Sequence, residues 1–186
     1  MPESVRVFDL AIVQTLADSR SEPLVSFFSV LSALGDTEAM IIATLVGVTL
    51  LYSQGHKPLA VGLLTAMISS TFLTVLLKFS IAEARPDALY SVYVESTYSF
   101  PSGHTSAAFA FFGFLAYIAL TRERHGTLRN FVIALAILYP VLMAFGRVYL
   151  GLHYVSDVIA GCAIGLLSAA IGVIVAQKLG SQKFRK

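Results

Sequence analysis

Long apolar runs dominate this chain, and short polar segments mark where each run ends. A helix needs about 20 apolar residues to cross a bilayer, and five of the runs reach or approach that length. They predict transmembrane helices over residues 37–52, 59–77, 101–121, 131–146 and 154–176. The sequence therefore predicts an all-α fold, a polytopic membrane bundle of about five transmembrane helices.

Two shorter apolar stretches precede these spans. In the first, Val5, Phe8 and Ile12 recur at helical spacing and the polar residues fall elsewhere, which predicts an amphipathic helix. Such a helix suits a membrane surface and equally a cap packed on the bundle. The second stretch, residues 24–34, is too short to span the membrane. We expect one domain, in which 1–35 are interfacial helices, 37–177 the transmembrane core and 178–186 a basic cytoplasmic tail.

Composition supports a membrane protein. Of the 186 residues, 56% are hydrophobic and 13% charged, and the mean hydropathy is +0.78. A soluble domain carries about 25% charged residues. The net charge of +2 gives no indication of nucleic-acid binding, and the single cysteine, Cys162, has no partner for a disulfide.

The basic residues predict how the chain is oriented, because loops rich in Lys and Arg stay in the cytoplasm. The 52–58 turn, the 121–130 connection and the tail from 177 share one side of a five-span bundle. Together they hold eight of the 13 Lys and Arg residues and one acidic residue, Glu123. We therefore expect the C-terminus in the cytoplasm and the N-terminus, with the long polar connection 79–100, outside.

Three polar clusters lie on that outer side, namely KFSIAEARP (78–86), PSGH (101–104) and GRVYLGLHYVSD (146–157). Lys78 and Arg85 are seven residues apart, so they share a helical face if the helix continues to Arg85. In PSGH, Ser102 suits an N-cap and Gly103 lets the backbone approach a ligand closely. The free amides of the following helix would attract an anion, to which His104 could give a proton.

The third cluster places Arg147 at the end of a span, and His153 and Asp157 four residues apart, adjacent on a helix. A carboxylate in that position orients an imidazole. Each cluster alone is more typical of charged residues at a membrane interface than of a catalytic site. Together they offer cations for a phosphate and two histidines to act as nucleophile and acid, which favours phosphoryl transfer.

In order and spacing, the clusters resemble the motifs of the type 2 phosphatidic acid phosphatase superfamily, which includes lipid phosphate phosphatases and vanadium haloperoxidases. Its pattern is Lys, six residues, Arg-Pro; then PSGH; then Ser-Arg, five residues, His, three residues, Asp. The match covers residues 78–157. Gly146 stands where the family has serine, so we expect less polar support for the phosphate or the arginine. Small bacterial members usually have six spans, and we expect this chain to lack the first and to keep only the amphipathic N-terminal segment.

The resemblance implies a role for each matching residue. His153 would attack phosphorus to form a phosphohistidine while Asp157 holds its other nitrogen, and His104 would protonate the leaving group and later activate water. No metal and no cofactor would be needed. The phosphate would be bound by Lys78, Arg85, Ser102, Gly103 and Arg147.

The implied function is an integral lipid phosphatase of the cytoplasmic membrane, with its active site on the extracytoplasmic face. Its substrate would be a lipid phosphomonoester or pyrophosphate, of the phosphatidylglycerophosphate, undecaprenyl pyrophosphate or phosphatidic acid class. The 87–100 loop, with Asp87 and Glu95, would select among them. A phosphotransferase with a lipid or sugar acceptor, and a small membrane transporter or channel, remain alternatives. The oligomeric state is not readable from the sequence.

Overall fold

The computed structural model describes residues 3–122 and 126–182, and within these ranges the ordered elements are all helical. Each apolar run of the sequence forms a helix, as predicted, and the all-α fold class is confirmed. The elements are α1 (Glu3–Asp18), α2 (Glu22–Ala33), α3 (Thr37–Ser53), α4 (Lys57–Ile81), the short 3₁₀ helix η1 (Ala88–Tyr90), α5 (Gly103–Arg122), α6 (Thr127–Tyr149) and α7 (Val155–Gln182).

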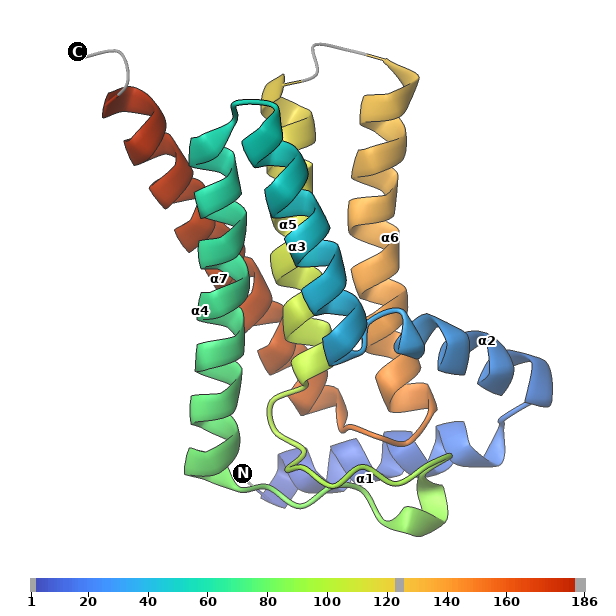
Figure 1. Cartoon of the computed structure of the whole chain (residues 1–186). Helices are drawn as coiled ribbons and strands as arrows, with labels where there is room; N and C mark the ends of the chain where they lie inside the picture. Colours follow the sequence, from blue (N-terminus) through green and yellow to red (C-terminus); the bar gives the residue numbers. More distant parts are fainter. Residues whose placement is uncertain (1–2, 123–125, 183–186) are drawn as a thin grey trace.

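Helices α3 to α7 run side by side and alternate in direction, so that α4 and α6 descend toward the end of the bundle where α1 lies (Figure 1). Among the described residues, α4, α5, α6 and α7 are long and apolar enough to cross a membrane. Helices α2 and α3 together qualify as a fifth span, bent by 49° at the break between them. Helices α4 and α6 extend past the predicted spans at both ends, and α7 extends past its span at the C-terminal end.

Helices α1 and α2 lie across one end of the bundle (Figure 1). The buried carboxylate of Asp9 in α1 accepts hydrogen bonds from the backbone N–H of Ser156, at 3.2 Å, and from its hydroxyl. Arg20 Nε donates to the carbonyl of Tyr149 at 2.7 Å. On the outer side of α1, Val7 and Phe8 are 64% and 58% exposed. The helix therefore caps the bundle and also presents an apolar surface, which combines the two readings of its sequence.

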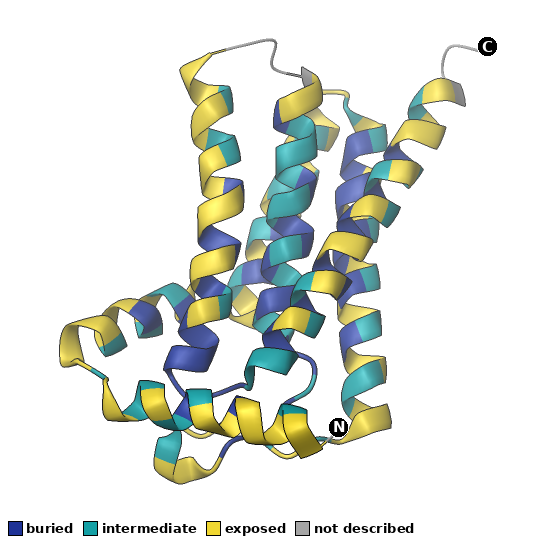
Figure 2. Cartoon of the chain, turned by 180° about the vertical axis from the view of Figure 1, so that it is seen from behind, coloured by how far each residue is buried: buried dark blue, intermediate teal, exposed yellow. Residues whose placement is uncertain are grey.

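Small residues let α7 approach α4 and α5 closely. A Cβ added at Gly165 would lie 2.5 Å from the Cβ of Phe109, and one added at Gly62 would lie 2.7 Å from the carbonyl of Gly172. The small residues of α7 therefore lie at helix interfaces. Buried residues follow the centre of the bundle, and the outer helix faces are largely exposed and apolar (Figure 2).

Parts of two predicted basic segments fall outside the described residues. These are Glu123, Arg124 and His125 of the connection between α5 and α6, and residues 183–186 of the predicted cytoplasmic tail.

Candidate active site

The three sequence clusters meet at the end of the bundle covered by α1, because α4 and α6 end there and α5 and α7 begin there (Figure 1). A cavity of about 1080 Å³ opens at this place. Of the residues proposed from the sequence, Lys78, Arg85, Gly103, His104 and His153 line it. Ser102, Arg147 and Asp157 are fully buried behind it.

Lys78 and Arg85 do not share a helical face, because the helix does not continue to Arg85. Helix α4 ends at Ile81, and Ala82 adopts a left-handed conformation with φ 50°, its N–H bonded to the carbonyl of Lys78 at 2.9 Å. The helix thus ends four residues before Arg85, where Pro86 also disfavours a helical conformation. The turn carries Arg85 back over the site, where its Nη1 donates to the carbonyl of Leu152 at 2.6 Å.

His153 is held between a carboxylate and a guanidinium. Its Nδ1 lies 3.2 Å from Asp157 Oδ2, and its Nε2 lies 3.2 Å from Arg85 Nη1. Because an arginine only donates, we assign the lone pair to Nε2 and the proton to Nδ1. His153 precedes α7, so the pair does not lie within one helix as expected. Asp157 Oδ2 also accepts the N–H of Tyr154 at 2.9 Å and the hydroxyl of Ser99 at 2.5 Å.

The surroundings of His153 favour its neutral form. Burial lowers its pKa well below the usual value, and the positive charges of Arg147, Arg85 and Lys78 lower the pKa further. At neutral pH the ring is therefore uncharged, with an electron pair on Nε2 and its Nδ1–H directed at Asp157. This is the protonation state that a nucleophilic histidine requires.

Glu95 lies between the two arginines and forms ion pairs with both Arg85 and Arg147. Burial on its own would raise the pKa of Glu95, but the charges of Arg147 and Arg85 outweigh it and lower the pKa to about 2. The sequence pointed to Glu95 only as part of a substrate-selecting loop. In the folded chain its carboxylate occupies the kind of position, between two guanidinium groups, that a phosphate would take.

Arg147 takes its remaining polar contacts from α2 and from the loop that follows η1. Its Nη1 donates to Ser32 Oγ of α2 at 2.7 Å and to the hydroxyl of Tyr93 at 3.3 Å, while its Nε has no partner among the described residues. At Gly146, a Cβ would lie 2.8 Å from the Phe28 ring, so a serine does not fit there. Ser32 therefore supplies Arg147 with a hydroxyl where the family's serine is missing.

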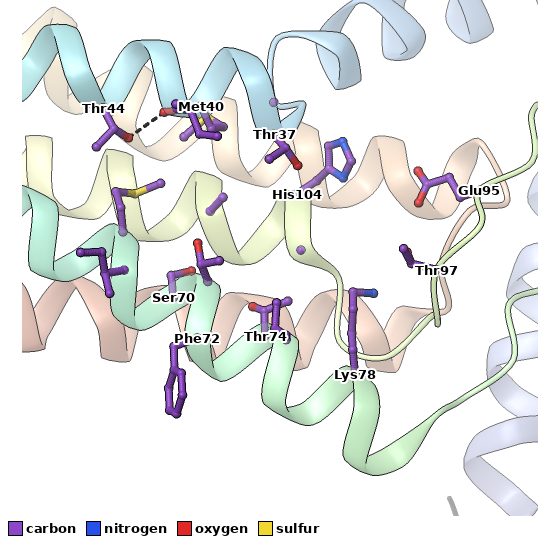
Figure 3. Close-up of a pocket in the computed structure, with 18 of the residues that line it drawn as sticks. Thr37, Met40, Thr44, Ser70, Phe72, Thr74, Lys78, Glu95, Thr97 and His104 are labelled. Carbon is purple, nitrogen blue, oxygen red and sulfur yellow. Dashed lines mark hydrogen bonds between the residues drawn. The ribbon is translucent and has the colours of Figure 1, made fainter.

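Lys78 and the PSGH segment complete the site. Lys78 Nζ donates to the carbonyls of Tyr98 and Ser99, and it points toward His104 and Glu95 across the cavity (Figure 3). Ser102 Oγ accepts from Thr105 at 3.0 Å, so its hydroxyl faces α5 and not the cavity. His104 Nε2 lies 2.8 Å from Asp36 Oδ1.

The sequence did not predict that four further residues contact the predicted site residues. Ser99 lies next to a predicted motif, and Glu95 was named for another role. Asp36 and Ser32 precede the first motif by more than 40 residues and have no motif of their own. In the described ranges, no group of three or more His, Cys, Asp or Glu side chains is arranged to hold a metal ion.

Known proteins share both sequence and fold with this chain. The family model described as "PAP2 superfamily" matches residues 59–181. Phosphatidylglycerophosphatase B of Bacillus subtilis is 37% identical over 112 residues, covering 57% of this chain and 53% of that protein. Lipid phosphate phosphatase delta of Arabidopsis thaliana is 30% identical over 141 residues, covering 70% of this chain and 34% of that protein. The chain thus spans about half, or less, of the length of these relatives.

A solved structure is similar over nearly the full length of the chain. It is the crystal structure of the first transmembrane PAP2 type phosphatidylglycerolphosphate phosphatase from Bacillus subtilis. The similarity has a TM-score of 0.84 at 26% identity and covers 95% of this chain and 88% of that one. It therefore includes most of the N-terminal region that precedes the three motifs.

Proposed function

The chain belongs to the PAP2 superfamily, and from this premise we propose that it is an integral-membrane lipid phosphatase that acts through a phosphohistidine. One observation carries the proposal. A neutral histidine, backed by a buried carboxylate, lies among three cations at the polar end of a cavity that continues between apolar helix faces. The polar end suits a phosphate, and the remainder suits a hydrocarbon chain.

The shape of the cavity favours a lipid over a soluble phosphate. Away from Lys78 and Arg85, it runs between α3 and α4 toward the middle of the bundle (Figure 3). Many of its apolar residues are also exposed on the outside of these helices, so the groove opens sideways toward the membrane. A lipid chain could enter there without leaving the bilayer. The exposed lining residues are Ile41, Leu45, Leu64, Ile68, Phe72 and Val75.

In the proposed reaction, the Nε2 lone pair of His153 attacks phosphorus while the bond to the leaving oxygen breaks. His104 gives a proton to that oxygen, which departs as an alcohol or phosphate. Neutral His104 then takes a proton from water, whose oxygen attacks phosphorus and releases phosphate as the P–N bond breaks. Lys78, Arg85 and the amide of Gly103 would neutralise the charge on the phosphoryl oxygens. Arg147 would join them once Glu95 moves aside.

We propose the same substrate classes as the sequence suggested: phosphatidylglycerophosphate, undecaprenyl pyrophosphate or phosphatidic acid. Support comes from the relatives named after phosphatidylglycerophosphate and lipid phosphates. Glu95 is the residue of the 87–100 loop that reaches the cavity with a charge. It would interact with a headgroup and contribute to the choice of lipid.

For the membrane arrangement, we propose that α1 and α2 lie at the outer surface of the cytoplasmic membrane and that α3 to α7 span it. The active site then faces outward and the C-terminus lies in the cytoplasm. The exposed apolar side chains of α1, such as Val7 and Phe8, support a position in the interface.

Phosphate release from a panel of lipid phosphates in detergent, with EDTA present, tests the function. We expect release by the wild type and a loss of roughly 10³-fold or more in His153→Ala, as for removal of a nucleophile. His56→Ala is the matched control, because His56 precedes α4 at the other end of the bundle. Full activity in His153→Ala would contradict the mechanism. A product that forms only with an acceptor would indicate a transferase, and ion flux without phosphate release a channel.

A further inference from the structure

We propose that Asp36 is a positioning residue for the general acid, holding the imidazole of His104 so that its other nitrogen faces the leaving group. The proposal rests on the proposed function. It adds a second carboxylate and histidine pair to the one formed by Asp157 and His153, built from a helix break that lies far from the three motifs.

The contact itself is short and specific. His104 Nε2 lies 2.8 Å from Asp36 Oδ1, and the side chains of the two residues are 18% and 51% exposed. His104 stands in the first turn of α5, and Asp36 immediately precedes α3. The neighbours of Asp36 in the chain, Gly35 and Thr37, line the same cavity as His104. The pair therefore borders the cavity from which the leaving group would depart.

The side chain of Asp36 does not take the usual role of an N-cap aspartate. It occupies the N-cap position of α3, with φ −60° and ψ 156°, yet its side chain makes no cap hydrogen bond. An N-cap aspartate ordinarily accepts an amide of its own helix, which is worth about 1 kcal/mol. Here the carboxylate leaves those amides and turns to His104. Asp36 thus lacks the common N-cap hydrogen bond and contacts another helix, α5, through His104.

Packing against α6 fixes where Asp36 stands. Gly35 is so close to α6 that an added Cβ would collide with the terminal methyl of Met143 and lie 3.2 Å from the Tyr139 hydroxyl. The hydroxyl of Tyr139 in turn donates to the carbonyl of Leu31 at 3.4 Å. The break between α2 and α3 is thus packed against α6, which sets the place from which the carboxylate reaches His104.

The chemistry explains why a carboxylate suits this position. A histidine that acts as an acid must carry protons on both ring nitrogens before the bond to the leaving group breaks. With Nε2–H donated to Asp36, the Nδ1–H is the proton that passes to the leaving oxygen, and a neutral ring remains. The negative charge of Asp36 favours the imidazolium and fixes the direction of its second N–H. Asp157, in contrast, accepts Nδ1–H from a histidine that is neutral until its Nε2 attacks phosphorus.

Leaving-group dependence tests this role. We would compare kcat/KM of wild type, Asp36→Ala and Asp36→Asn on dioctanoyl phosphatidic acid and on p-nitrophenyl phosphate. An alkyl alkoxide needs a proton to depart, whereas p-nitrophenolate does not, so loss of the acid affects the first substrate selectively. We expect Asp36→Ala to lose about 10- to 100-fold on the lipid and only about 2-fold on the aryl ester, since general acids contribute about 10² or more. Asn, which keeps an acceptor, should fall between.

Two further variants make the outcome decisive. Glu38→Gln removes an exposed carboxylate from the same first turn of α3 and should change neither substrate. In a His104→Ala background, Asp36→Ala should have no additional effect, because the two residues act as one unit. Equal losses on both substrates, or a full additional loss in the His104→Ala background, would overturn the proposal. If the wild type releases phosphate from neither substrate, the proposed function fails instead.

Discussion

Glu95 gives the site an internal anion, and replacing it should lower the stability of the fold by a measurable amount. Because Arg147 is fully buried and paired with Glu95, Glu95→Gln leaves a buried cation without its negative partner. Loss of one partner of a fully buried pair costs about 3 to 5 kcal/mol. The Glu95 side chain is 21% exposed, so we expect a smaller loss, about 1 to 3 kcal/mol. Thermal unfolding in detergent measures it.

Added phosphate separates this explanation from a general defect. Phosphate binding between the two arginines should raise the unfolding temperature of Glu95→Gln more than that of the wild type. Asp87→Asn, a change in the same loop, serves as the control. A phosphate response identical in wild type and Glu95→Gln would contradict the explanation.

The pH dependence of stability has a definite sign. Because the pKa of Glu95 is lowered, the pair stabilises the fold above about pH 4.5, and that stability is lost as pH falls toward about 2.

Helix α7 depends on glycine where it crosses α5. At Gly165, an added Cβ would lie 2.5 Å from both the Cβ of Phe109 and the carbonyl of Ser106, and neither can move without shifting the helix. We expect Gly165→Ala to destabilise the protein by about 1 to 3 kcal/mol, the usual cost of overpacking. Activity should fall too, since α5 carries His104 and α7 carries Asp157.

Gly180 of the same helix supplies the comparison. A Cβ there has no neighbour within 4 Å, so Gly180→Ala should be neutral or stabilise α7 by roughly 0.5 to 1 kcal/mol. Unfolding temperatures of both variants in the same detergent give the result. Equal stability of the two would show that the close crossing does not limit the packing of α7 on α5.

The helices were more predictable than the contacts between them. Long apolar runs place the spans because the bilayer requires them, and the alternation of the spans predicted that Lys78, His104 and His153 meet at one end of the bundle. The route of the chain between the elements was not predictable. The turn at Ala82 brought Arg85 back over the site, and the break at Gly35 brought Asp36 to His104. Both follow from tertiary packing, which leaves no periodic pattern in the sequence.

The three motifs lie at the α1 end of the bundle, so the orientation of the bundle would decide on which side the proposed reaction releases phosphate. Figure 1 shows the η1 segment at the end near α1 and the turn between α3 and α4 at the opposite end. Leu89 of η1 is 81% exposed, and Gln54 in the turn is also exposed. In a Cys162→Ser background, Leu89→Cys and Gln54→Cys place one accessible thiol at each end.

A membrane-impermeant maleimide distinguishes the two orientations in intact cells. Because basic residues such as Lys57 gather at the Gln54 end, we expect Leu89→Cys to react at once and Gln54→Cys only after permeabilisation. The reverse pattern would place the site in the cytoplasm. With the predicted pattern, the groove between α3 and α4 would receive lipid at the outer end of the bundle. In the proposed reaction phosphate would then leave on the outside, and the dephosphorylated lipid would return to the bilayer through the same lateral opening.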